Sequence, residues 1–177
     1  MNNYSSLRRA LLTCTGLFLI FLVTCTQVEW TEYRSEADRF AAFFPGTPTE
    51  SSKTVNTAIG PIEMKIYGVA KKQTAFSVVL SDYPPEHVKR VGSATILDGA
   101  RDGAVANTQG KLLSELIIEI AGNPGRDLKI SAAGGKGTVR AKLFLVGSRL
   151  YQVLAVTPTE DSYAPQVGRF LESFKLL

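Results

Sequence analysis

The sequence predicts an α+β protein with a mainly antiparallel β-sheet between covering helices, an α/β/α arrangement of layers. Strand-like segments follow one another through turns rich in glycine and proline, which is typical of antiparallel hairpins. Two other segments carry apolar residues at helical spacing. The segments 143–146 and 150–156 are apolar on both alternating sets of positions, so each must be covered on two sides.

Strands are expected throughout the first half of the chain. The prolines of the segment 45–48 end one of them, because proline cannot donate to a sheet ladder. Two later strands form a hairpin around Gly60-Pro61. The strands expected in this half are 30–34, 39–44, 50–56, 62–69 and 75–80.

A helix is expected next, from an N-cap at Ser93 to about Asn107. Glycine inside a helix costs about 0.5–1 kcal/mol relative to alanine. Its repeated use here is explained if small residues let the helix backbone lie close against the sheet. The small residues concerned are Gly99, Ala100, Gly103 and Ala104.

The second half continues with a meander of strands and ends in a second helix. Glycine-bearing turns separate the strands, which are expected at 112–121, 126–132, 138–146 and 150–156. The last helix begins near Ser162 and has Pro165 in its first turn, where the missing N–H is harmless. Its apolar side consists of Val167, Phe170, Leu171 and Phe174.

The N-terminus resembles an export leader. Arg8 and Arg9 precede an uncharged apolar run, and Leu22-Val23-Thr24-Cys25 resembles a bacterial lipobox, although Thr24 departs from the usual small residue. A lipoprotein anchored through Cys25 is the first interpretation. An uncleaved membrane anchor is the second, because residues 10–28 carry no charge and about 20 apolar residues span a bilayer. Cleavage to a soluble secreted form is the third.

These features divide the chain into a leader (1–24), a short tether with the first strand (25–35) and one globular domain (36–177). Both cysteines, Cys14 and Cys25, lie outside that domain, which therefore has no disulfide or thiolate ligand. Loss of the two leader arginines lowers the formal charge from +4 to +2. No cluster of basic residues indicates a nucleic-acid partner.

Three short motifs resemble the PsbP-like family, which includes extrinsic subunits of photosystem II and their bacterial relatives. They are GNPGRDL (122–128), GSRLYQV (147–153) and RFLESF (169–174), and the resemblance covers most of residues 36–177. It implies an α/β/α domain and, where family function applies, a membrane protein complex as partner. No metal-binding or partner-contact residue of the family can be matched to a position here.

The domain shows no catalytic constellation. His87 is the single histidine, and no Ser-His-Asp set, zinc spacing or close carboxylate pair is present. We therefore expect no enzymatic activity, no metal and no cofactor. The candidates for partner contact are Tyr83, Pro84 and Pro85, because tyrosine beside prolines forms a stiff amphipathic segment, and Arg126 in a turn.

The sequence thus predicts an exported, membrane-anchored module that faces the periplasm or the cell exterior and acts through protein contact. Its expected partners are membrane lipid, through Cys25, and a membrane protein complex. The alternative is a small exported ligand-binding domain or enzyme with a pocket between sheet and helix.

Overall fold

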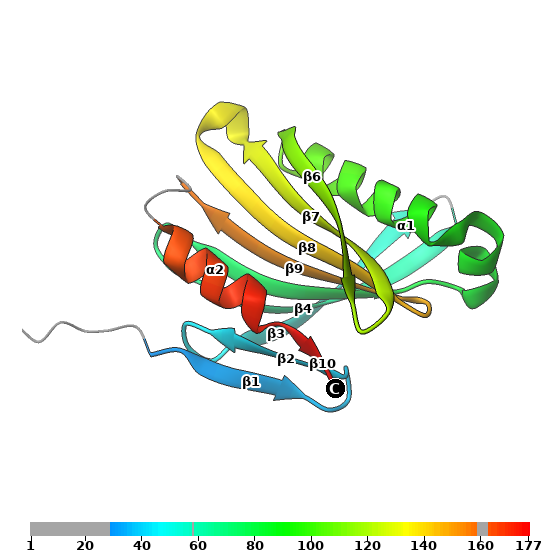
Figure 1. The fold of residues 1–177 in the computed structure, drawn as a ribbon, viewed down its shortest axis with the longest axis horizontal. Helices are drawn as coiled ribbons and strands as arrows, with labels where there is room; N and C mark the ends of the chain where they lie inside the picture. Colours follow the sequence, from blue (N-terminus) through cyan, green and yellow to red (C-terminus); the bar gives the residue numbers. More distant parts are fainter. Residues whose placement is uncertain (1–28, 58, 159–162) are drawn as a thin grey trace, which may run out of the picture.

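The computed structural model describes residues 29–57, 59–158 and 163–177 (Figure 1). Strands dominate these residues, and the two α-helices lie on different sides of the main sheet. In chain order the elements are β1 (Thr31–Ser35), β2 (Phe40–Phe44), β3 (Thr49–Thr57), β4 (Gly60–Ala70), β5 (Ala75–Asp82), α1 (Pro85–Asn107), β6 (Lys111–Ile120), β7 (Asn123–Ala132), the 3₁₀ turn η1 (Ala133–Gly135), β8 (Gly137–Val146), β9 (Arg149–Thr157), α2 (Ala164–Ser173) and β10 (Lys175–Leu176).

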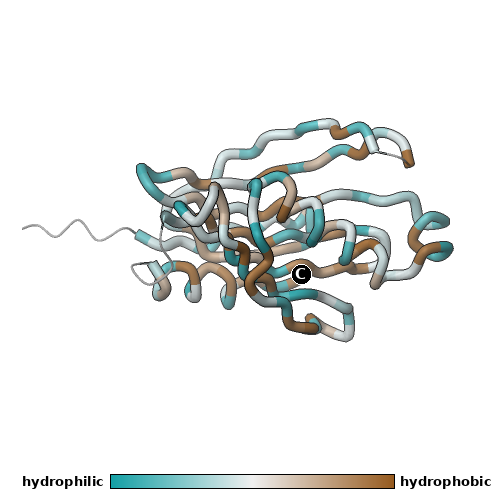
Figure 2. Tube along the Cα trace, turned by 90° about the horizontal axis from the view of Figure 1, so that it is seen from above, coloured by the Kyte–Doolittle hydropathy of each residue, from teal (hydrophilic) through white to brown (hydrophobic). Residues whose placement is uncertain are grey.

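The main sheet has seven antiparallel strands in the order β3-β4-β5-β9-β8-β7-β6. Sequence neighbours pair as hairpins, and the β5–β9 pairing joins the two halves of the chain. As the sequence predicts, the central strands are buried on both faces: Leu150, Tyr151 and Val153 of β9 are at most 3% exposed. Figure 2 shows apolar and hydrophilic segments interleaved along the trace, as expected for elements whose two sides differ.

One face of this sheet packs against α1. Ile96 and Leu97 of the helix are buried against Leu128 and Ile130 of β7 and against β8. The helix starts eight residues before the predicted N-cap at Ser93, and Gly92, with φ 82° and ψ 159°, breaks it between the two parts. Pro85 therefore begins a helix at a place where the sequence was expected to give a loop.

The opposite face packs against α2 and a second, three-stranded sheet in the order β1-β2-β10. Val167, Phe170, Leu171 and Phe174 are all buried, as predicted for the apolar side of the last helix. Aromatic rings fill the space between the two sheets, with Phe170 between Phe44 of β2 and Phe76 of β5. The predicted cover of two helices is thus only partly found, because a small sheet supplies much of one layer.

The prediction that a glycine stripe brings α1 close to the sheet is wrong. A Cβ atom built on Gly99 or Gly103 would meet no atom within 4 Å beyond its own turns of the helix. The helix instead contacts the sheet through Ile96 and Leu97, whereas Gly99 and Gly103 make no such contact. Ala100 and Ala104 pack at the margin of this core.

The β6–β7 turn is tighter than predicted. Ala121 and Gly122, with φ of 48° and 78°, form the turn, and Asn123 already belongs to β7. Gly125, expected in the turn, is a strand residue whose added Cβ would lie 2.4 Å from the Leu143 carbonyl oxygen. Close approach of β8 therefore requires glycine there.

Candidate functional site

The predicted contact residues Tyr83, Pro84 and Pro85 lie at the start of α1. The Tyr83 N–H donates to the carbonyl of Ser148 at 2.9 Å, and its half-buried side chain packs beside the core under α1. Burial raises the pKa of the Tyr83 phenol. Pro84 and Pro85 are exposed where the helix begins, so any contact through this segment would involve the prolines first.

Arg126, the other predicted contact residue, lies on β7, with β9 and β8 between its strand and β5. Its Nε lies 2.9 Å from the Glu115 carboxylate and its Nη2 lies 3.4 Å from Asp98. Arg101 binds the same Glu115 at 3.0 Å. This network joins α1 to β6 and β7 and leaves 13% of the Arg126 side chain exposed. The structure therefore does not bring Arg126 together with the Tyr83 segment.

Cys25 lies outside the described residues, so its acylation stays a prediction. In the described part of the chain, no helix is long and apolar enough to cross a membrane. The same residues contain no cluster of three or more histidine, cysteine or acidic side chains that could hold a metal. His87 lies in the first turn of α1, with its Nδ1 2.9 Å from Nη2 of Arg90.

The two edges of the main sheet differ in polarity. Strand β3 has the sequence TESSKTVNT and is polar along nearly its whole length. Strand β6, KLLSELIIEI, exposes 51% of Leu113, 64% of Leu116 and 82% of Ile117. A bulge at Leu113 interrupts the β6–β7 register, and the rest of β6 is regular. The sequence identified this strand but could not show that it forms an edge.

A groove of about 350 Å³ lies between α1 and the part of the sheet that the helix does not cover. Gly99 and Gly103 form one wall of the groove. Apolar side chains of β4, β5 and β9, such as Met64, Val79 and Leu154, form the other. The exposed Val156 lies at its margin, and the polar groups that reach it include Gln152.

Asp38, in the β1–β2 connection, is a buried carboxylate at the centre of an ionic cluster that sequence reasoning missed. Its carboxylate accepts hydrogen bonds from the Tyr67 hydroxyl and from Lys65 Nζ at 3.0 Å, and Arg149 lies 3.5 Å away. The Tyr151 hydroxyl donates to the Asp38 carbonyl at 2.9 Å. Burial by itself would raise the pKa of Asp38, but these hydrogen bonds and cations outweigh it and lower the pKa. The cluster fixes the small sheet to the main one.

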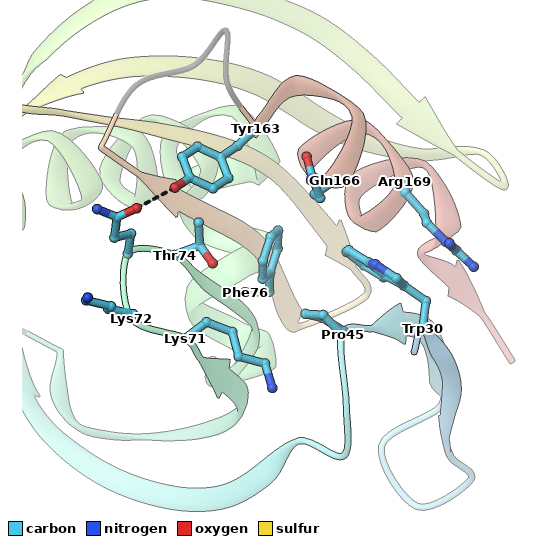
Figure 3. A pocket seen from close by; sticks show the side chains of 10 residues that line it. Trp30, Pro45, Lys71, Lys72, Thr74, Phe76, Tyr163, Gln166 and Arg169 are labelled. Carbon is cyan, nitrogen blue, oxygen red and sulfur yellow. Dashed lines mark hydrogen bonds between the residues drawn. The ribbon is translucent and has the colours of Figure 1, made fainter. Parts of the chain in front are cut away.

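A second concave region, of about 480 Å³, lies at the end of the domain where the described chain begins (Figure 3). Trp30 precedes β1, Lys71 and Lys72 belong to the β4–β5 turn, and Tyr163 and Arg169 come from α2 and its start. The Tyr163 hydroxyl donates to the Gln73 amide oxygen at 2.7 Å. These side chains come from positions between 30 and 169, and no pattern in the sequence indicated that they lie together.

No family model matches the sequence, and no curated protein matches it. The structure is similar to the solution structure of cyanobacterial PsbP (CyanoP) from Synechocystis sp. PCC 6803, with a TM-score of 0.57 and 14% identity over 87% of this chain and 96% of that one. The crystal structure of PA94, a Pseudomonas aeruginosa protein of unknown function, gives a TM-score of 0.40 and 15% identity over 78% of this chain and 90% of that one. The likeness to CyanoP shows that the α+β fold of this chain is PsbP-like.

Proposed function

We propose that this protein is an exported, membrane-anchored accessory module that acts by binding another protein. The observation that supports protein contact is the apolar free edge at β6. Ile117 is 82% exposed and Leu116 is 64% exposed, and the described residues place no further strand beside the outer N–H and C=O groups of β6.

Free sheet edges pair readily with other chains, and proteins commonly protect them with charged or polar residues. This protein has polar residues along the β3 edge, whereas β6 exposes leucine and isoleucine. An extended segment of a partner could add to β6, gain backbone hydrogen bonds and cover these side chains. The resemblance to PsbP-like proteins supports a membrane protein complex as that partner.

Site-specific photo-crosslinking in cells tests the contact. A photoreactive residue at position 117 should give an adduct with another membrane-associated protein, and Leu116→Glu should weaken that adduct by placing a charge in the interface. The same photoreactive residue at Thr54, on the polar β3 edge, is the matched control and should give none. Equal adducts at both edges, or an adduct only with a second copy of this chain, would contradict the proposal.

The anchor is tested at Cys25. Several acyl chains hold a protein stably on a membrane, whereas one holds it only marginally. Cys25→Ala should therefore release the protein from membranes or block its maturation, as measured by fractionation of cells. Cys14→Ala, within the leader, should leave fractionation unchanged. Mass spectrometry that finds an unacylated N-terminus beyond Cys25 would disprove the lipoprotein interpretation.

A second candidate function is the binding of an apolar ligand, and the groove between α1 and the sheet favours it. Gly103→Leu should fill this groove without overpacking, because no atom of the sheet lies within 4 Å of the added Cβ. Leucine also has the higher helix propensity, so the urea midpoint should stay unchanged or rise. Mass spectrometry of organic extracts should then find an apolar molecule with the wild-type protein and little with the variant. Equal amounts with both proteins would argue against this function.

A further inference from the structure

The concave region at Trp30 combines cations with aromatic side chains. Lys71, Lys72 and Arg169 are exposed, and the lining residues that the structure describes include no carboxylate. The Arg169 guanidinium lies over the Trp30 ring at 5.2 Å from its centroid. Trp30 also packs edge-on against Phe76 at 5.5 Å, so its position is defined by the core. Among the described residues, Glu29, exposed next to Trp30 in the chain, reduces the local positive charge by one.

This region is also where the chain arrives from its N-terminal segment. At about 3.3–3.6 Å per residue, the five steps from Cys25 to Trp30 reach at most about 18 Å. A domain of about 150 residues has a radius of gyration of about 15 Å and is roughly 40 Å across. A protein anchored at Cys25, or through residues 10–28, must therefore hold its Trp30 end nearest the bilayer.

From these two observations we infer that the Trp30 end of the domain docks on anionic phospholipid headgroups. Lys71, Lys72 and Arg169 contact lipid phosphates, and Trp30 and Tyr163 lie at the headgroup level, where tryptophan and tyrosine are enriched. The inference rests on the proposed N-terminal anchoring. In the resulting orientation, the end of the main sheet opposite Trp30 points away from the membrane.

Trp30 is the only tryptophan of the sequence, so its fluorescence reports on this surface alone. The full chain is reconstituted into vesicles of phosphatidylcholine, with or without phosphatidylglycerol, that contain lipids brominated near the headgroup. We expect Trp30 quenching in the anionic vesicles, little in the neutral ones, and a decrease at high salt. Each basic side chain strengthens such binding about fivefold, so Lys71→Gln/Lys72→Gln should lower the docked-to-undocked ratio about 25-fold.

The matched control is Lys89→Gln/Arg90→Gln, an exposed basic pair on α1 near the opposite end of β5, and it should leave quenching unchanged. Vesicle flotation distinguishes a failure of the docking surface from a failure of the N-terminal anchor. A chain that fails to float has lost the proposed anchoring. A chain that floats but shows no quenching, or equal quenching in neutral and anionic vesicles, overturns the docking surface alone.

Discussion

Replacing Phe170 with alanine is expected to lower the free energy of unfolding by about 3–5 kcal/mol. Phe170 is completely buried on α2, and its ring centroid lies 5.1 Å from that of Phe44 and 5.4 Å from that of Phe76. Phe44 belongs to the small sheet and Phe76 to the main sheet. The substitution therefore opens a cavity where both sheets and the helix meet. Against a domain stability of about 5–15 kcal/mol, this loss is large.

Urea unfolding followed by circular dichroism measures the effect. Trp30 fluorescence is a second signal, because Trp30 contacts Phe76 within the same aromatic cluster. Gln166→Ala, on the exposed side of α2, is the control and should change stability by no more than about 0.5 kcal/mol. A loss of less than about 1 kcal/mol in Phe170→Ala, close to the range of surface substitutions, would contradict the burial of Phe170 between the two sheets.

The strands could be predicted because alternation and turn residues are local signals. Each expected strand coincides with one of β1 to β9, and the hairpin around Gly60-Pro61 forms as β3 and β4. The apolar side of α2 was also predicted correctly, since Val167, Phe170 and Leu171 recur at helical spacing. The turn after β6 was misplaced by a few residues, because Ala121 adopts a positive φ that no glycine or asparagine indicated.

The layering could not be predicted from the same signals. Residues 39–44 show that a strand is buried, but not that β2 pairs with β1 and β10 in a separate sheet. The helix expected from Ser93 begins at Pro85 instead, because proline is also compatible with a helix start. The glycines of α1 were interpreted as a packing surface, although a groove leaves the same residues unpacked.

The candidate surfaces were harder still to predict from the sequence. They depend on which strand lies at the edge of the sheet and on side chains that are distant in sequence. Leu116 and Ile117 look like ordinary core residues until β6 is found at the edge. Trp30, Lys71 and Arg169 meet only through the packing of α2 and the β4–β5 turn against the start of β1. By contrast, Arg126 was expected in a turn, whereas it lies within β7 and its charge is largely satisfied by Glu115 and Asp98.

The second large effect is expected at Asp38, which is 3% exposed and links the two sheets. Breaking a buried ion pair costs about 3–5 kcal/mol. Lys65 and Arg149 keep 38% and 27% of their side chains exposed, so solvent screens part of the interaction. We therefore expect Asp38→Ala to lower the free energy of unfolding by about 2–3 kcal/mol. The matched control is Glu36→Gln, which alters an exposed carboxylate in the same connection and should have little effect.

The stability contributed by Asp38 should also depend on pH in a defined direction. Its pKa in the folded protein is lowered, whereas the unfolded value is about 3.9. The carboxylate therefore stabilises the fold fully above the unfolded pKa, and this contribution is lost as the pH falls through the folded pKa. Urea midpoints of the wild type and of Asp38→Asn, measured from neutral pH downward, should converge in this acidic range. Other carboxylates affect both proteins alike, so a gap that stays constant to low pH would show that the Asp38 charge does not hold the two sheets together.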